Sequence, residues 1–86
     1  MRYRITFENR ASREMRRLLT HPIYPRISAA IDGLQDDPRP PGCKKLSVGP
    51  AWRIRVGDYR NLYQVSDVVR IVTVQRVAHR GAVYDE

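Results

Sequence analysis

The clearest pattern in the chain is the strict alternation of apolar and basic residues at the start of the stretch 51–65. Apolar side chains and arginines take turns along it: Trp52, Arg53, Ile54, Arg55 and Val56. Successive side chains of a strand point to opposite faces, so this pattern predicts a strand with one apolar and one guanidinium face. Gly57-Asp58 suits a two-residue turn, and a second partly apolar strand that carries Arg60 follows it. We therefore predict a β-hairpin here.

Two helices are predicted ahead of the hairpin, after a half-buried strand at 2–7. Asn9 is a suitable N-cap for the first helix. Its apolar residues recur at helical spacing and mark the buried face: Ala11, Met15, Leu18 and Leu19. A break with two prolines at 20–25 ends this helix and suits the first turn of the next. The second helix has the same kind of apolar face and stops before Pro38: Ile27, Ala30, Ile31 and Leu34.

The remaining segments complete an α+β domain that takes up the whole chain, residues 1–86. The proline-rich stretch 36–43 is a connector, and 44–48 is a short strand. After a turn at Ser66-Asp67, the apolar run 68–77 predicts an interior strand of the sheet. The element order is β-α-α-β-β-β-β. It favours a helical hairpin packed on one face of a mostly antiparallel, twisted sheet, with Arg53 and Arg55 on the other, wet face.

The charge narrows the choice of partners. The chain has 86 residues and a net charge of +7, and 14 of its 16 basic residues are arginine. Such a balance favours nucleic acid or an acidic protein as a partner, although the arginines of the first helix are best explained as a solvated face. Cys43 is the only cysteine, which excludes an intramolecular disulfide and fits a reducing compartment. Without an apolar run of 18 residues or a signal sequence, we expect a cytoplasmic protein with no membrane partner.

No phosphate-binding glycine loop, nucleophile elbow or cysteine–histidine cluster is present, so we expect no metal or cofactor. What remains is a set of arginines with two residues near the end of the chain: Arg53, Arg55, Arg60 and Arg80, with His79 and Tyr84. Arginines stabilise the charge that develops when an RNA 2′-OH attacks its neighbouring phosphate, and Tyr84 supplies stacking or a proton. His79 is the candidate base or an ordinary surface histidine. From chemistry alone, plain nucleic-acid binding is favoured over cleavage.

Several segments in this order resemble the RelE/ParE superfamily of bacterial and archaeal type II toxins. They are YRITF with ASREMRRL, PRPPGCKKL, WRIRVGDYRNLYQVSD and RIVTVQRVAHRGAVY, and together they cover nearly the whole chain. The most specific part is the GDYR-x-x-Y-x-V core followed by the HR-x-x-VY ending. The resemblance implies the same small α+β fold.

For RelE-like members the resemblance implies a metal-independent endoribonuclease that cuts mRNA in the ribosomal A site by 2′-OH attack and so inhibits translation. Arg53 and Arg55 then match strand positions that are lysine in well-known members, and Arg60 matches the arginine after the turn. Arg80 and Tyr84 match the arginine and tyrosine of the terminal motif. Because arginine gives up its proton less readily than lysine, proton transfer is the doubtful role here, and His79 is the candidate to share it.

Two other functions stay open. One is a ParE-like poison of DNA gyrase, which shares the fold without the catalytic set. The other is a non-catalytic member that only binds an antitoxin and regulates transcription with it. In every case the resemblance implies a cognate antitoxin, RelB-like or similar, in a hetero-oligomer. We expect it to be acidic and to fold onto the basic surface.

Overall fold

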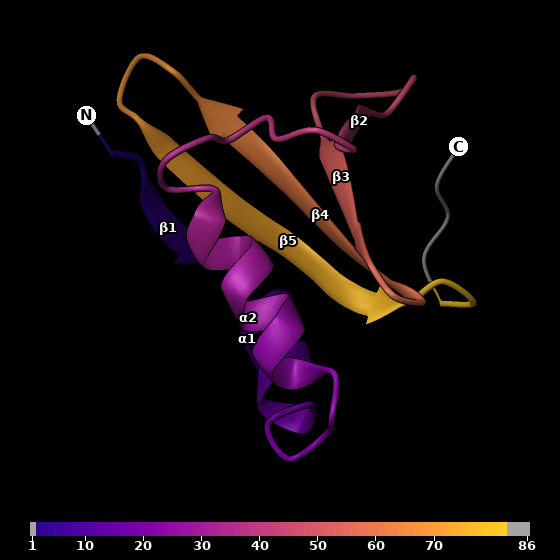
Figure 1. Ribbon diagram of the computed structural model, residues 1–86. Coiled ribbons are helices and arrows are strands. Elements are labelled where there is room, and N and C mark those ends of the chain that lie inside the picture. Colours follow the sequence, from indigo (N-terminus) through magenta and orange to yellow (C-terminus); the bar gives the residue numbers. More distant parts are fainter. Residues whose placement is uncertain (1, 83–86) are drawn as a thin grey trace.

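A computed structural model of the chain describes residues 2–82 (Figure 1). The order of the elements is β-α-α-β-β-β-β, as predicted. The elements are β1 (Arg4–Phe7), α1 (Asn9–Arg17), α2 (Tyr24–Gly33), β2 (Lys44–Lys45), β3 (Trp52–Val56), β4 (Tyr59–Ser66) and β5 (Ile71–His79). None of the helices in this part of the chain is both long and apolar enough to span a membrane.

The strands form one mixed sheet in the order β1-β5-β4-β3-β2. The pairs β2–β3, β3–β4 and β4–β5 are antiparallel, and β1 pairs in parallel with β5, with Arg4 opposite Ile71. β5 is an interior strand, as its apolar sequence predicts. The prediction of an α+β fold with a mostly antiparallel sheet is therefore confirmed.

Both helices pack on the same face of the sheet (Figure 1), and the core lies between the two layers. One cluster joins Ala11 of α1 and Ile27 of α2 to Val77 of β5. A second cluster joins Leu34, just after α2, to Ile54 and Tyr63 of the sheet. The apolar spacing of both helix sequences therefore identifies residues that are buried in the fold.

The first helix begins and ends differently from the prediction. Its N-cap is Glu8, whose carbonyl accepts the first helical hydrogen bond from Ser12, and Asn9 is the first helical residue. Leu19 lies beyond the C-cap Leu18 and is 59% exposed, so it does not belong to the buried face. The helix therefore ends at Arg17, two residues before the last residue of its predicted apolar face.

The last two strands meet in a longer turn than the sequence predicts. The turn occupies residues 67–70, and β5 starts only at Ile71. Val68 and Val69 are therefore exposed at the tip of the turn, and Arg70 has a left-handed backbone with φ of 57°. The predicted strand at 44–48 is likewise reduced to the two residues of β2.

Candidate functional site

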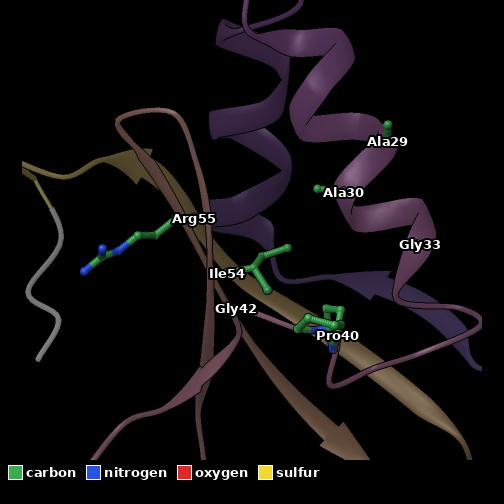
Figure 2. Close-up of a pocket in the computed structure, with 8 residues that line it drawn as sticks. Ala29, Ala30, Gly33, Pro40, Gly42, Ile54 and Arg55 are labelled. Atoms are coloured by element: carbon green, nitrogen blue, oxygen red, sulfur yellow. The ribbon is translucent and has the colours of Figure 1, made fainter.

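The two faces of β3 differ as the alternation predicts. Ile54 and Val56 are buried in the core beneath the helices. Figure 2 shows Ile54 directed toward α2 and Arg55 directed away from the helices, to the other side of the sheet. The face of β3 opposite the helices is therefore the one that presents guanidinium groups.

Three of the predicted site residues are brought together on this face. Arg55 in β3 and Arg60 in β4 are direct cross-strand partners, and Arg53 lies two residues along β3, diagonal to Arg60. Side chains that face each other across an antiparallel pair have Cβ atoms about 4.5–5.5 Å apart. We call Arg53, Arg55 and Arg60 the arginine triplet.

The members of the triplet lie at different depths. Arg55 is exposed, whereas Arg53 is only 3% and Arg60 only 8% exposed. The expectation that Arg53 would project into solvent is therefore wrong, because burial depends on what covers a side chain and not only on the face it occupies. A guanidinium keeps its charge when buried, so two of the three positive charges are fixed in place.

Arg80 lies at one end of the hairpin. Its backbone N–H donates to the carbonyl of Asp58 in the hairpin turn at 2.8 Å. Its Nε lies 3.9 Å from Oδ1 of Asp58, and both side chains are exposed. The end of β5 is thereby tied to the turn between β3 and β4, so Arg80 lies near the end of the strands that carry Arg55 and Arg60.

His79 lies on the opposite face. Its cross-strand partner is Tyr59, which packs against the core under the helices, whereas the neighbouring Arg60 faces the other way. The His79 and Tyr59 rings meet edge to face at 5.5 Å, and Nδ1 of His79 accepts a hydrogen bond from the Gly81 N–H at 3.2 Å. The structure therefore separates His79 from the arginine triplet. Tyr84 lies outside the described residues.

Glu14 is a structural residue whose role the sequence pattern does not reveal. It lies in the arginine-rich α1, but its carboxylate accepts a hydrogen bond from the Val77 N–H at 2.7 Å. The same carboxylate accepts from Nε of Arg76 at 3.1 Å and contacts its Nη2 at 3.0 Å. Arg76 is thus held in an ion pair with α1, which makes it a structural residue and not a fourth member of the triplet.

A second polar cluster holds the proline-rich connector against the far end of the sheet. The guanidinium of Arg39 donates two hydrogen bonds to Asp67, at 3.1 and 2.9 Å, and lies 5.2 Å from the centre of the Trp52 ring. The Tyr3 hydroxyl donates to the same carboxylate at 2.6 Å. The hydrogen bonds from Arg39 and Tyr3 lower the pKa of Asp67 to about 2. Burial raises the pKa of Tyr63, whose hydroxyl donates to the Pro38 carbonyl at 2.7 Å.

The sheet therefore offers a patch of three arginines, with Arg80 at its end. Guanidinium groups bind phosphate oxygens in a forked geometry and stabilise charge that develops on them. Arginine is a poor proton acceptor, so the triplet supplies charge and not a base. The arrangement suits binding and polarising a phosphodiester.

Comparisons with known proteins agree with this fold. A sequence model described as the ParE toxin of the type II toxin-antitoxin system parDE matches residues 5–84. No curated protein sequence matches at a significant level.

Several solved structures are similar over nearly the full chain. The archaeal RelE–RelB complex from Pyrococcus horikoshii OT3 has 25% identity, a TM-score of 0.80, and coverage of 96% of this chain and 100% of the other. The toxin–antitoxin complex RelBE2 from Mycobacterium tuberculosis has 31% identity, a TM-score of 0.70, and coverage of 93% and 100%. A mutant of the E. coli toxin RelE in the free state has 28% identity, a TM-score of 0.78, and coverage of 95% and 87%.

Proposed function

Since the chain belongs to the RelE/ParE superfamily of type II toxins, we propose that it is a ribosome-dependent endoribonuclease that cleaves mRNA in the A site. The observation that carries the proposal is the arginine triplet on the helix-free face of the sheet, with Arg55 directly opposite Arg60. Arg55 is the exposed member of the triplet, and Arg53 and Arg60 are buried beside it on the same face. Guanidinium groups held in this way suit the binding of a phosphodiester and the stabilisation of charge on its oxygens.

The proposed reaction transfers the phosphoryl group within the RNA. The 2′-oxygen forms a bond to phosphorus, the bond from phosphorus to the 5′-oxygen breaks, and the products are a 2′,3′-cyclic phosphate and a 5′-hydroxyl. Arg55 and Arg60 stabilise the negative charge that builds up on the phosphate oxygens, and Arg53 supports them from beneath. Arg80 holds a neighbouring phosphate, and Tyr84 stacks on a base.

Proton transfer is assigned to the toxin bound to the ribosome and its mRNA, and not to the arginine triplet alone. The 2′-hydroxyl proton has to leave and the 5′-oxygen has to gain one, and arginines do neither well. His79 and His21 both lie near this end of the sheet, but the rings of both pack on Tyr59, whose side chain lies on the opposite face. We therefore propose that the ribosome aligns the mRNA, so that in-line geometry and charge stabilisation account for most of the rate.

A second candidate function is poisoning of DNA gyrase. It is favoured by the family model, which is that of the ParE toxin and extends over residues 5–84. In that case the arginine triplet binds gyrase or DNA and performs no chemistry. A third candidate, a non-catalytic member that acts only with its antitoxin, has no particular observation in its favour.

The partner common to these proposals is a cognate antitoxin in a hetero-oligomer. The similar structures from Pyrococcus horikoshii and Mycobacterium tuberculosis are complexes of a toxin with its antitoxin. With a net charge of +7, this chain favours an acidic antitoxin that covers the arginine triplet.

The deciding experiment adds the purified protein to ribosomes programmed with a defined mRNA and maps the products. Cuts at the A-site codon with cyclic phosphate ends support the nuclease. A parallel assay with gyrase and supercoiled DNA scores cleaved complexes. Intact mRNA together with gyrase-dependent DNA breaks would replace the nuclease proposal by the second candidate.

A further inference from the structure

The helix-facing side of the sheet contains a polar residue in an apolar setting. Asn61, in the middle of β4, is completely buried, with an exposed fraction of 0%. Its cross-strand partners are Ile54 in β3 and Val77 in β5, which are both buried and apolar. Facing residues share a side of the sheet, and Ile54 points toward α2 (Figure 2). The Asn61 amide therefore lies in the core under the helices.

The buried amide of Asn61 is left unpaired by the part of the chain that the structure describes. Neither its Nδ2 nor its Oδ1 has a hydrogen-bond partner there. A side-chain amide can donate two hydrogen bonds and accept two, and most buried polar groups in folded proteins have at least one partner. A buried polar group without a partner lowers the ratio of folded to unfolded chains roughly tenfold to a hundredfold.

The local backbone gives no reason for an asparagine at this position. β4 is an interior strand of the sheet, and asparagine is depleted in strands. Asparagine is favoured where the backbone is left-handed, but Arg70 is the residue other than glycine that has such a backbone in the described chain. Leucine has the branching of asparagine without its polar atoms, and valine suits a strand. The amide at position 61 is therefore a cost that the fold does not require.

Asn61 lies between the two core clusters. Along β4 it is the helix-facing residue between Tyr59, which packs on the first cluster, and Tyr63, which belongs to the second. Ile5 and Ala30 pack against both clusters, but each of them is only partly buried. On the central strand of the sheet the two clusters are thus separated by a polar side chain.

The second cluster is held less firmly than the first. Leu34, which follows the end of α2, is its buried residue from the helix layer. In the first cluster both helices contribute buried residues, among them Ala11 and Ile27. The carboxylate of Glu14 also ties α1 to the Val77 N–H at 2.7 Å. We therefore expect the second cluster to open before the first.

We propose that Asn61 is a built-in weak point of the core that limits the lifetime of the free chain. When the second cluster opens, water bonds to the amide, whereas in the closed fold the amide lacks a partner. The open form is therefore more populated than it would be with an apolar residue at this position. A protease cuts the open form, so the rate of degradation follows this population when opening is fast. A partner that binds only the closed fold slows degradation by mass action.

Digestion of the purified full chain by thermolysin under native conditions tests the proposal. Asn61→Leu and Asn61→Val remove the amide, and we expect digestion to slow at least about tenfold. The midpoint of thermal unfolding should rise by about 5 °C or more. Gln64→Leu is the matched control, because it makes the same change from amide to leucine at a half-buried position of β4. It should slow digestion less than about threefold.

Two variants at position 61 guard against overpacking by one of them, so a gain in either folded variant supports the proposal. Unchanged or faster digestion of both would show that the amide is satisfied in the folded chain, and would overturn it. Failure of both variants to fold would also overturn it, because the fold would then require the amide. An equal gain from Gln64→Leu would show that added apolar surface, and not the buried amide, is responsible.

Native-state hydrogen exchange locates the opening. The Leu34 N–H donates to the Ile31 carbonyl at 3.0 Å and reports on the second cluster. Its exchange should slow at least about tenfold in Asn61→Leu and stay nearly unchanged in Gln64→Leu. Unchanged exchange at Leu34 in the folded Asn61→Leu chain would contradict the opening of this cluster. Asn61 faces away from the arginine triplet, and neither measurement uses mRNA cleavage, so a failure of the nuclease proposal leaves this test intact.

Discussion

Arg55 and Arg60 are direct partners across β3 and β4, yet Arg55 is exposed and Arg60 is almost completely buried. Both point to the face without helices, so their charges are held together by the strand register. The two residues share a face of the sheet but differ in burial. A substitution at the exposed Arg55 therefore tests the chemistry, whereas a substitution at the buried Arg60 also affects stability.

The first prediction concerns the exposed member of this pair. Arg55→Gln removes a guanidinium from the site without opening the core, and cleavage of ribosome-bound mRNA should fall about 10²–10³-fold. Because Arg55 is exposed, the free energy of unfolding should change by no more than about 0.5 kcal/mol. The measurements are single-turnover cleavage rates and urea unfolding.

Arg13 provides the control for the loss of one positive charge. It is exposed on α1, far in the sequence from the triplet, and Arg13→Gln should change cleavage much less than Arg55→Gln does. A similar loss in both variants would show that net charge, and not the triplet, determines activity. Arg60→Gln should lower both cleavage and stability, because it disturbs a buried position as well as the site.

The alternation along β3 shows what the sequence can predict. Strand geometry alone predicts that the Ile54 and Arg55 side chains point to opposite faces of the sheet. Figure 2 confirms that Ile54 points toward α2 and Arg55 points away from the helices. The burial of Arg53 and Arg60 is different, because it depends on what packs over that face of the sheet and not on the alternation itself. Alternation assigns a face, but it does not assign a depth.

The turn at 67–70 shows a second limit. Val68 and Val69 are β-branched and predict a strand, but both are exposed in the turn. Asp67 at the start of this turn is held by Arg39 and Tyr3, which are 28 and 64 residues away in the sequence. A local preference for strand is overridden here by contacts that no local pattern contains.

The second prediction concerns His79. General acid–base catalysis by a side chain contributes about 10²–10⁴-fold, so a histidine with that role is easily detected. Because His79 packs on Tyr59 on the helix face, we expect His79→Asn to lower the cleavage rate less than about tenfold. The pH dependence of the rate should keep its shape. A loss of more than about 10²-fold together with the disappearance of one limb of the pH profile would make His79 the base.

The third prediction concerns Glu14, which joins α1 to β5. Glu14→Ala leaves the Val77 N–H and the Arg76 guanidinium without their partner in a mostly buried place. The free energy of unfolding should fall by about 3 kcal/mol, and the midpoint of thermal unfolding by more than about 10 °C. Glu14→Gln keeps an acceptor for Val77 and should lose less. Equal losses in the two variants would show that the carboxylate charge, not the hydrogen bond to Val77, accounts for the effect.

The fourth prediction concerns Asp67 and acid. Its folded-state pKa of about 2 lies below the ordinary value of 3.8, so its ionisation stabilises the fold above about pH 4. This contribution is lost as the pH falls toward 2, where the carboxyl becomes protonated in the folded state as well. Asp67→Asn should therefore be less stable than the unchanged chain at pH 7, and the difference should shrink between about pH 4 and 2.

Urea unfolding at a series of pH values from 7 down to 2 measures this difference directly. Asp32→Asn is the matched control for the loss of one carboxylate, because Asp32 is exposed on α2. Tyr3→Phe removes one of the hydrogen bonds that lower the pKa of Asp67, so it should move the acid transition of the unchanged carboxylate to higher pH. A difference between Asp67→Asn and the unchanged chain that is constant from pH 7 to 2 would show that Asp67 contributes through shape and not through its charge.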